Sequence, residues 1–547
     1  MPAAPRVLCD LAAAHGVAAA FGIVSVHNQP LVDALAAAGR YTPVRHEATA
    51  VNAADGYSRV ADGLGIAVTS TGTGAGNAAG SLIEALTAGS RVLHVTGNID
   101  SVHLGEGRGV IHETKAQDHM LAAVSKAQHT VRSADTVAAV LGRAVDEAQR
   151  PPTGPVSVEI PIDLQYAPGP DPSTGPASAA GPADGSGANG AAEIDGDIDR
   201  VVALLGAAER PLVWAGGGAV PARAEVAELC RRHSIPLVTS NAGRGVIAED
   251  DPLVVGNFAS SPDGQQLLDE ADLLVSIGTH FRSNETRHYN LRLPDRHIQI
   301  DVDPAAIGRA YPCTVGIVGR AEHVIPVLLA EGVPRDRGGW CARASELAAE
   351  ARAQLRAGIG PYAELCDAMR AVLPAASPLV RDVTIPSSSW GNRLLPVLDP
   401  TTNVNARGGG IGQGLGMAIG AASARPESPT LVMVGDGGLA VHLGELATVA
   451  QEQLPIVAVV FNDGGYGVLR NLQDAHVGRR SGVDLATPDF AALAGAFGIE
   501  HRRLAHPSES LRTMEGAVAA GAPILVEVDC DEFGPMPVPF VPPVPVP

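Results

Sequence analysis

Aromatic residues and basic runs are both scarce in this sequence. Only 3% of its 547 residues are aromatic, so a core must be filled mainly by Ala, Val, Leu and Ile, which suits parallel strands covered by helices on both faces. The formal net charge is −20, and no Lys/Arg-rich run opposes it locally. Such a chain repels phosphate backbones, which argues against nucleic acid as a partner.

Paired cysteines and long apolar runs are also missing. The six cysteines are scattered without a CxxC pair, which predicts neither a zinc site nor a disulfide framework and fits a reducing cytoplasm. No apolar run reaches the roughly 18 residues that a membrane span needs, and the N-terminus lacks the apolar core of a signal peptide. We therefore expect a cytoplasmic protein without a membrane segment.

What the sequence does contain is an alternation of short β-rich runs with Ala-rich helical segments, in three parts of the chain. This pattern predicts the α/β class with three consecutive doubly wound parallel-sheet domains. A stretch dense in Gly, Pro and Ala indicates a linker. The boundaries we expect are an N-terminal domain at 1–166, the linker at 167–195, a central α/β domain at 196–333, a connecting segment at 334–360 and a C-terminal domain at 361–547. The Pro-rich tail excludes a helix or interior strand, which leaves a frayed end or an extended arm.

Two glycine-rich acidic turns follow apolar strands in the last third of the chain. The first comprises Gly435, Asp436, Gly437 and Gly438, and the second runs from Asn462 through Asp463 to Gly465, Tyr466 and Gly467. Both lie at carboxyl ends of neighbouring strands, where open α/β sheets bind ligands. Mg²⁺ prefers oxygen ligands and shares them with phosphates, so Asp436, Asp463 and a backbone carbonyl near Gly465 can supply three of them.

The glycines of these turns let the backbone approach a diphosphate closely, and a following helix N-terminus favours its negative charge. Either turn taken alone is also explained as an ordinary tight turn. The pair, on adjacent strands, favours a site for a metal ion and a diphosphate.

Together the two turns resemble the cofactor motif of thiamine diphosphate enzymes, a family that includes acetolactate synthases, pyruvate oxidases, benzoylformate decarboxylase and benzaldehyde lyase. That family has three α/β domains in the order pyrimidine-binding, central and diphosphate-binding, so the resemblance covers nearly the whole chain and implies thiamine diphosphate and Mg²⁺ as cofactors. Asp463 departs from the family, where Asn is usual, but still offers an oxygen to the metal. In the segment ARGGGIGQGLGMAIGAA at 406–422, the resemblance makes Gly410 and Ile411 part of the cofactor site. Ile411 would bend the cofactor, the alternative being an ordinary core isoleucine.

The segment RHEATAVNAADGYSRVADG at 45–63 resembles the pyrimidine-binding half of the same family. By that resemblance Glu47 is the glutamate that hydrogen-bonds the aminopyrimidine ring. A carboxylate there favours the imino tautomer, whose nitrogen can remove the C2 proton of the thiazolium. A glutamate bonded to its own helix start is the structural alternative.

Two histidines are candidates for moving protons near the substrate, because the pKa of imidazole lies near neutrality. By resemblance His27 takes the position of an active-site histidine in benzaldehyde lyase and several decarboxylases. His112 takes a position where lyases and synthases often carry Gln. Either residue could instead be structural. Ser70 stands in the place of a second catalytic histidine of benzoylformate decarboxylase, so that relay is not reproduced here.

Three further segments, at 107–118, 279–286 and 381–395, resemble a branch that contains 5-guanidino-2-oxopentanoate decarboxylase. By this match Ser388, Trp390 and Asn392 line the mouth of the substrate pocket, although a buried Trp390 packing on the Gly-rich turn is an equal alternative. The glycines at 216–218 could be a vestigial loop of the kind that holds FAD in some relatives. Nothing else in the sequence indicates FAD.

The resemblance implies an enzyme, specifically a 2-oxo acid decarboxylase dependent on thiamine diphosphate and Mg²⁺ that acts through an ylid and an enamine. An acetolactate synthase-like carboligase or acyloin lyase is the first alternative. A non-catalytic cofactor-binding protein is the alternative from another class, and Glu47 argues against it. The family also implies a homodimer or homotetramer with active sites at the subunit interface, where Glu47 of one subunit faces Asp436 and Asp463 of another.

Overall fold

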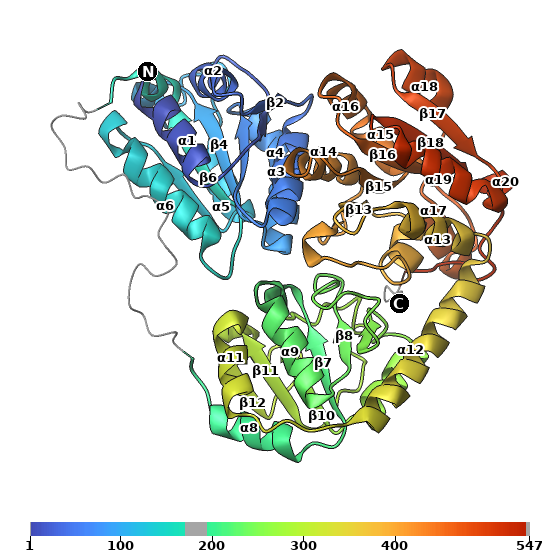
Figure 1. Cartoon of the computed structure of the whole chain (residues 1–547). Helices are drawn as coiled ribbons and strands as arrows, with labels where there is room; N and C mark the ends of the chain where they lie inside the picture. The colour runs from blue at the N-terminus through green and yellow to red at the C-terminus, as the bar shows by residue number, and fades with distance from the viewer. Residues whose placement is uncertain (1, 170–193, 543–547) are drawn as a thin grey trace.

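The computed structural model describes residues 2–169 and 194–542. These residues form three α/β units, each built on one six-stranded sheet (Figure 1). Every strand pair inside the sheets is parallel. This confirms the predicted fold class. Most of the predicted linker at 167–195 lies outside the described residues, and the exact domain boundaries stay a prediction.

The N-terminal unit has the strand order β2-β1-β3-β4-β6-β5. Its strands are β1 (Ala20–Gly22), β2 (Tyr41–Pro43), β3 (Gly65–Thr69), β4 (Val92–Asn98), β5 (Ala127–Thr130) and β6 (Val156–Pro161). Its helices are α1 (Ala3–Ala14), α2 (Gln29–Ala37), α3 (Glu47–Ala61), α4 (Thr73–Ala88), η1 (Ser101–His103), α5 (Gln117–Val124), η2 (Ala134–Thr136), α6 (Val137–Gln149) and α7 (Ile162–Tyr166). All residues of β3 and β6 are buried, as expected for strands covered on both faces.

The central unit has a different order, β12-β11-β10-β7-β8-β9. Its strands are β7 (Pro211–Ala215), β8 (Leu237–Thr239), β9 (Val254–Gly256), β10 (Leu273–Ile277), β11 (His297–Asp301) and β12 (Val315–Val318). Its helices are α8 (Ile198–Ala207), η3 (Gly217–Ala222), α9 (Arg223–His233), α10 (Pro262–Glu270), η4 (Pro304–Ala306) and α11 (Ala321–Glu331). The long helix α12 (Gly338–Ile359) then leads to the third unit.

The C-terminal unit has the order β14-β13-β15-β16-β18-β17. Its strands are β13 (Leu379–Arg381), β14 (Asn403–Asn405), β15 (Thr430–Gly435), β16 (Ile456–Asn462), β17 (Glu500–Leu504) and β18 (Ile524–Asp529). Its helices are α13 (Tyr362–Val372), the π-turn η5 (Ser387–Gly391), η6 (Pro400–Thr402), α14 (Gly414–Ala424), α15 (Asp436–Val441), η7 (Leu443–Glu445), α16 (Leu446–Gln451), α17 (Gly467–His476), α18 (Phe490–Ala496), η8 (Pro507–Glu509), α19 (Ser510–Ala519) and α20 (Cys530–Phe533).

The first and third units pack together through helix α3 of the first and helix α14 of the third, which lie side by side in Figure 1. A β-carbon at Gly56 would lie 2.1 Å from the carbonyl oxygen of Met417, and one at Gly420 would lie 1.8 Å from that of Ala53. Glycine is therefore required for the two helix backbones to approach each other. One hydrophobic core extends through both units, whereas the central unit has a core of its own.

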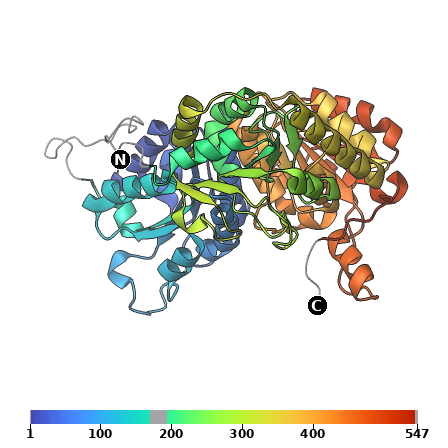
Figure 2. The same ribbon diagram turned by 90° about the horizontal axis from the view of Figure 1, so that it is seen from below.

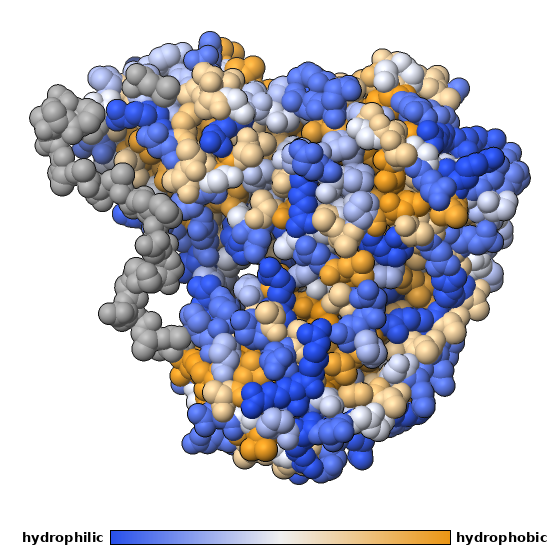
Figure 3. Space-filling view, in the orientation of Figure 1, coloured by the Kyte–Doolittle hydropathy of each residue, from blue (hydrophilic) through white to orange (hydrophobic). Residues whose placement is uncertain are grey.

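The central unit packs against both other units, as Figures 1 and 2 show from two directions. The guanidinium of Arg282 donates to the carbonyl of Thr87 in the first unit and to that of Arg407 in the third, both at 2.6 Å. No helix in the described parts of the chain is long and apolar enough to cross a membrane. On the face shown in Figure 3, apolar patches are interspersed with hydrophilic ones.

The described part of the Pro-rich tail lies over the C-terminal unit. The backbone N–H of Val538 donates to the carbonyl of Gly358 in α12 (3.0 Å), and the side-chain amide of Asn471 donates to the carbonyl of Phe540 (2.9 Å). Residues 534–542 therefore match the extended arm, one of the two alternatives that the sequence left open.

Candidate cofactor site

The two acidic turns of the C-terminal unit are in direct contact. Strands β15 and β16 are neighbours, and Asp436 begins helix α15 directly after β15. Its buried carboxylate accepts the backbone N–H of Gly437 at Oδ1 (2.7 Å) and that of Gly465 at Oδ2 (2.8 Å). The structure thus brings together the two turns that the sequence singled out.

Asp463 lies in the same site and is only partly exposed. Burial, and then the charge of Asp436, raises the pKa of Asp463 to about 6. Arg470 is its nearest cation, with Nη1 3.9 Å from Oδ2. Two carboxylates this close repel each other, and a divalent cation between them would relieve that repulsion.

These residues fit Mg²⁺ that also has phosphate ligands. Asp436, Asp463 and a backbone carbonyl of the second turn offer oxygens only, which is the donor set that Mg²⁺ prefers. No group of three or more His, Cys, Asp or Glu in the described residues could hold a metal by itself. A metal at this site would therefore need ligands beyond these side chains, such as water or the oxygens of a bound diphosphate.

The glycines of the turns are required by close packing within the site. A β-carbon at Gly467 would lie 1.9 Å from Oδ2 of Asp463, and one at Gly437 would lie 2.8 Å from the ring of Tyr466. Gly465 has a φ of +145°, which L side chains rarely adopt. Residues with a side chain can therefore not replace these glycines without displacing their neighbours.

A buried carboxylate that sequence reasoning missed shapes the next loop. Asp382 follows β13 and accepts backbone N–H groups from Gly412 (2.9 and 3.2 Å) and Gly414 (3.2 Å). Burial raises its pKa to about 6. This anchors the loop that carries Gly410 and Ile411. Ile411 is 39% exposed, so it is not an ordinary core isoleucine.

Glu47 is the first residue of α3 in the N-terminal unit. Its Oε2 accepts the side-chain amide of Asn77 (3.0 Å). The start of the helix is capped by His46 instead, whose Nδ1 accepts the backbone N–H of Ala48 (3.1 Å). The Glu47 carboxylate is therefore not needed to cap its own helix.

His27 and His112 lie together, with ring centroids 5.2 Å apart and edge to face. His27 is buried, and its Nδ1 has no hydrogen-bond partner among the described residues. Burial, and then His112, lowers the pKa of His27, although the charge of Asp100 opposes this. His112 has a φ of +66°, a conformation that costs free energy outside glycine and is often found at functional sites.

A buried polar network behind these residues was also missed. Oε1 of Gln117 accepts the hydroxyl of Thr71 (2.8 Å) and the backbone N–H of Gly72 (2.7 Å), and its Nε2 donates to Glu159 (2.7 Å). The turn fixed in this way also carries Ser70, whose buried hydroxyl has no partner among the described residues. A Gln beside the predicted His112 segment was the only sequence signal for this network.

The three residues expected at the pocket mouth occupy different environments. Trp390 is fully buried in the core of the C-terminal unit, and its ring packs edge to face on Phe461 at 6.1 Å. This burial favours a packing role for Trp390, and its place at the pocket mouth stays a prediction. Ser388 and Asn392 are partly buried beside it, and their role stays a prediction.

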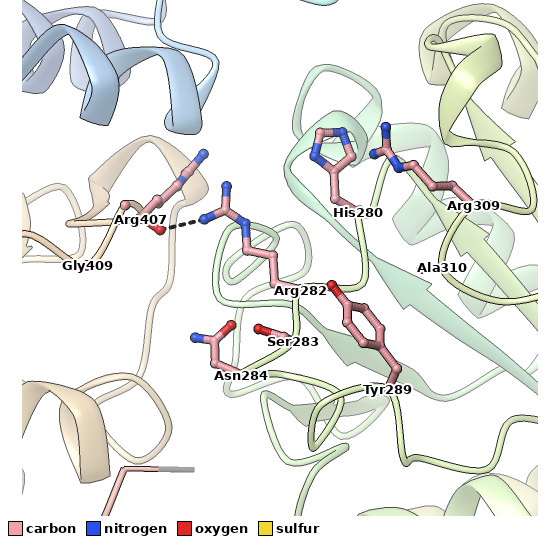
Figure 4. Close-up of a pocket in the computed structure, with 10 residues that line it drawn as sticks. His280, Arg282, Ser283, Asn284, Tyr289, Arg309, Ala310, Arg407 and Gly409 are labelled. Carbon is pink, nitrogen blue, oxygen red and sulfur yellow. Dashed lines mark hydrogen bonds between the residues drawn. The ribbon is translucent and has the colours of Figure 1, made fainter. Parts of the chain in front are cut away.

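A separate cavity of about 690 Å³ contains none of the predicted site residues (Figure 4). It is lined by His280, Arg282, Ser283, Asn284, Tyr289, Arg309, Ala310, Arg407, Gly408 and Gly409. The nearby glycines at 216–218 are needed by the fold, because a β-carbon at Gly216 would lie 2.1 Å from the carbonyl oxygen of Gly278. These glycines are therefore no evidence for FAD.

Comparison with known proteins matches three family models to the chain in sequence order. They are the thiamine pyrophosphate enzyme N-terminal TPP binding domain at residues 4–122, the central domain at 198–328 and the C-terminal TPP binding domain at 386–528. Each model falls on one of the three sheets.

Similar proteins carry two kinds of name. A probable 2-ketoarginine decarboxylase of Pseudomonas aeruginosa is 31% identical over 533 residues, which cover 96% of this chain and 93% of that protein. A probable acetolactate synthase large subunit of Methanocaldococcus jannaschii is 27% identical over 97% of this chain and 92% of its own length. The large subunit of acetolactate synthase isozyme 2 of Escherichia coli is 26% identical over 95% and 94%. With near-complete coverage at 31% identity and all three domain models in order, this chain belongs to the thiamine pyrophosphate enzyme family.

Proposed function

We propose that this protein is a 2-oxo acid decarboxylase that depends on thiamine diphosphate and Mg²⁺. The observation that carries the proposal is the Asp436 carboxylate, which joins the two acidic turns through the backbone of Gly437 and Gly465. The name of the 31% identical relative supports decarboxylation.

In this proposal Asp436, Asp463 and the carbonyl of Gly465 hold Mg²⁺. The backbone around Gly435, Gly437, Gly438 and Gly467 leaves room for the diphosphate, and Gly410, Ile411 and Tyr466 contact the rest of the cofactor. Thiamine diphosphate, when bound, supplies an electron sink for the carbanion that is left when carbon dioxide departs. Asp382 keeps the loop with Ile411 in place through its bonds to Gly412 and Gly414.

Proton transfer falls to residues of the N-terminal unit. Glu47 would share a proton with the aminopyrimidine ring of a bound cofactor, and Asn77 holds the Glu47 carboxylate through a hydrogen bond. His27 is neutral at pH 7 because burial lowers its pKa, so it can accept or relay a proton at Nδ1, which is free of partners in the described structure. His112 contacts its ring edge to face and would orient it.

We further propose a homodimer or homotetramer with active sites between subunits. Val24, Val26 and Ile111 lie within three residues of the two histidines in sequence, and Val102 belongs to the same β4–α5 segment as His112. All four side chains are exposed by 57–72%. Exposed apolar side chains of this size favour burial against another surface. A second subunit that brings Asp436 and Asp463 to Glu47 would provide it.

A carboligase is the second candidate, favoured by the acetolactate synthases among the similar proteins. The deciding experiment is a screen of pyruvate and longer 2-oxo acids with cofactor and Mg²⁺, in which carbon dioxide and coupled products are both measured. Carbon dioxide with an equal amount of aldehyde supports the decarboxylase. A coupled 2-hydroxy product would instead support the carboligase, and failure to turn over any 2-oxo acid would contradict both.

A further inference from the structure

The start of helix α3, which carries Glu47, is fastened to the C-terminal unit of the same chain. The backbone N–H of Arg45 donates to Oε1 of Glu445 (2.9 Å). The Arg45 side chain donates to Oγ1 of Thr448 (3.0 Å) and to Oε1 of Gln451 (2.7 Å). These bonds join segments that are 400 or more residues apart in sequence and meet two residues before Glu47.

Glu445 is buried, and both of its oxygens are engaged. Oε1 holds the backbone of Arg45, and Oε2 accepts the hydroxyl of Thr448 (2.6 Å). Burying a carboxylate is costly unless hydrogen bonds compensate for the lost water. Glu445 therefore binds both the segment before α3 and the first turn of α16. It is suited to holding the start of α3 in a fixed position relative to α16.

We call the bonds of Arg45 to Glu445, Thr448 and Gln451 the clamp. A contact between two histidine rings lies beside it. His46 packs on His442 with centroids 5.1 Å apart. Burial, and then His46, lowers the pKa of His442 to about 4, so its ring is uncharged at pH 7. His442 follows the last residue of α15, and Asp436 is the first. Within one chain, α15 therefore separates the Asp436 turn from His442, whose ring contacts the residue that precedes Glu47.

We propose that Glu445 is a positioning residue for Glu47, so that the C-terminal unit sets the direction of the carboxylate that acts on the aminopyrimidine. This inference rests on the proposed function. Without the bond to the Arg45 N–H, the segment that leads into α3 loses its only backbone bond to Glu445, and a shift of this segment displaces Glu47 because it is the first residue of the helix. Proton transfer requires hydrogen-bond geometry, so a small displacement slows it.

The direct readout is exchange of the C2 proton of bound cofactor with deuterium, measured without substrate by acid quench and proton NMR. This step depends on the Glu47 carboxylate and not on substrate binding. We expect Glu445→Ala to slow exchange about tenfold, the typical effect of losing a hydrogen bond to a charged group. Cofactor affinity measured by calorimetry should stay within about threefold of wild type.

Two matched variants separate positioning from general damage. Glu445→Gln keeps an oxygen that can accept the Arg45 N–H, and we expect it to restore most of the exchange rate. Gln451→Ala removes two exposed hydrogen bonds, one from the Arg45 side chain and one to Glu452, and leaves both bonds of Glu445 intact. We expect this variant to exchange at the wild-type rate.

An unchanged exchange rate in a folded Glu445→Ala variant overturns the inference. If that variant does not fold, Thr448→Val replaces it, because it removes both the bond that orients Oε2 of Glu445 and the bond from the Arg45 side chain. There we expect a loss of about threefold, and an unchanged rate again overturns the inference. A wild-type protein that does not accelerate exchange, or a Glu47→Gln variant that exchanges at the wild-type rate, contradicts the proposed function itself.

Discussion

The first sheet, β2-β1-β3-β4-β6-β5, and the third, β14-β13-β15-β16-β18-β17, have the same strand order when each is numbered from its own first strand. The helix that follows the second strand is α3 in one and α14 in the other, and these two helices pack together. The central sheet follows a different order. The outer two units therefore share one architecture.

The first and third units also share a buried carboxylate on the strand that comes last in the sequence of each unit. Glu159 on β6 accepts the amide of Asn98 (3.1 Å), and Glu527 on β18 accepts the amide of Asn462 (2.8 Å). Each Asn is the last residue of the neighbouring strand. The second oxygen binds Gln128 (2.7 Å) in the first unit and His501 (2.9 Å) in the third. We call each Glu–Asn pair a polar latch, Glu159–Asn98 in the first unit and Glu527–Asn462 in the third. The two latches link corresponding strands of the two sheets.

What differs is the residues that follow the strands. In the third unit, β15 and β16 are followed by glycine and aspartate, which suit a metal ion and a diphosphate because the backbone can come close. In the first unit, Glu47 begins the helix after β2, Ser70 follows β3, and His112 lies in the segment after β4, and these residues suit proton transfer. In the proposed function, the two outer units share one strand order and carry different chemistry in the segments that follow their strands. The following predictions test that division.

The largest effect is expected in the first unit. Glu47→Gln should lower turnover about 10²- to 10⁴-fold, the usual contribution of general acid–base catalysis. Cofactor affinity should change little, because the metal and the diphosphate are held by the other unit. Steady-state kinetics and calorimetry on the same preparation check this. Wild-type turnover in the variant would remove Glu47 from the mechanism.

The corresponding change in the third unit should affect binding instead. Asp436→Ala removes a metal ligand and the contact between the two turns, so affinity for Mg²⁺ with thiamine diphosphate should fall by more than about 100-fold, beyond the effect typical of residues behind a metal ligand. Calorimetry measures the change, and circular dichroism controls for folding. Affinity within a few-fold of wild type would argue against a metal at this turn.

A smaller effect follows from the pKa of Asp463, which is raised to about 6. Metal binding requires the carboxylate to be deprotonated. Affinity for Mg²⁺ should therefore be nearly constant above pH 7 and fall about tenfold per pH unit below pH 6. Asp463→Asn, with the residue usual in the family, should bind with a flatter pH profile. Equal pH profiles for the two proteins would contradict the assignment of Asp463.

Substitutions in the two polar latches should give the smallest effects. They should also distinguish most clearly between metal binding in the third unit and proton transfer in the first. Glu527→Gln should weaken Mg²⁺ binding about threefold, since Asn462 directly precedes Asp463, and leave the rate of a saturated enzyme unchanged. Glu159→Gln should lower that rate about threefold through Gln117 and leave metal affinity unchanged. Titrations and saturation kinetics measure both. The same response from both variants would show that the latches only stabilise the fold.

Much of this arrangement could be predicted from sequence. Parallel sheets follow from buried apolar runs, and the contact between the Asp436 and Asp463 turns follows from their position after neighbouring strands. Asp382 and Glu159 could not be predicted, because their partners lie about 30 to 60 residues away in sequence and a lone acid carries no local pattern. The environment of Trp390 was left open between two alternatives, because its sequence segment does not reveal that its ring enters the core against Phe461.

The central claim is that the two acidic turns hold thiamine diphosphate through a divalent cation. Calorimetric titration of the purified wild-type protein with thiamine diphosphate tests it directly, once with Mg²⁺ and once with a chelator. We expect saturable binding with Mg²⁺ and its loss with the chelator. Absence of binding in both titrations, or equal affinity in both, would contradict the claim.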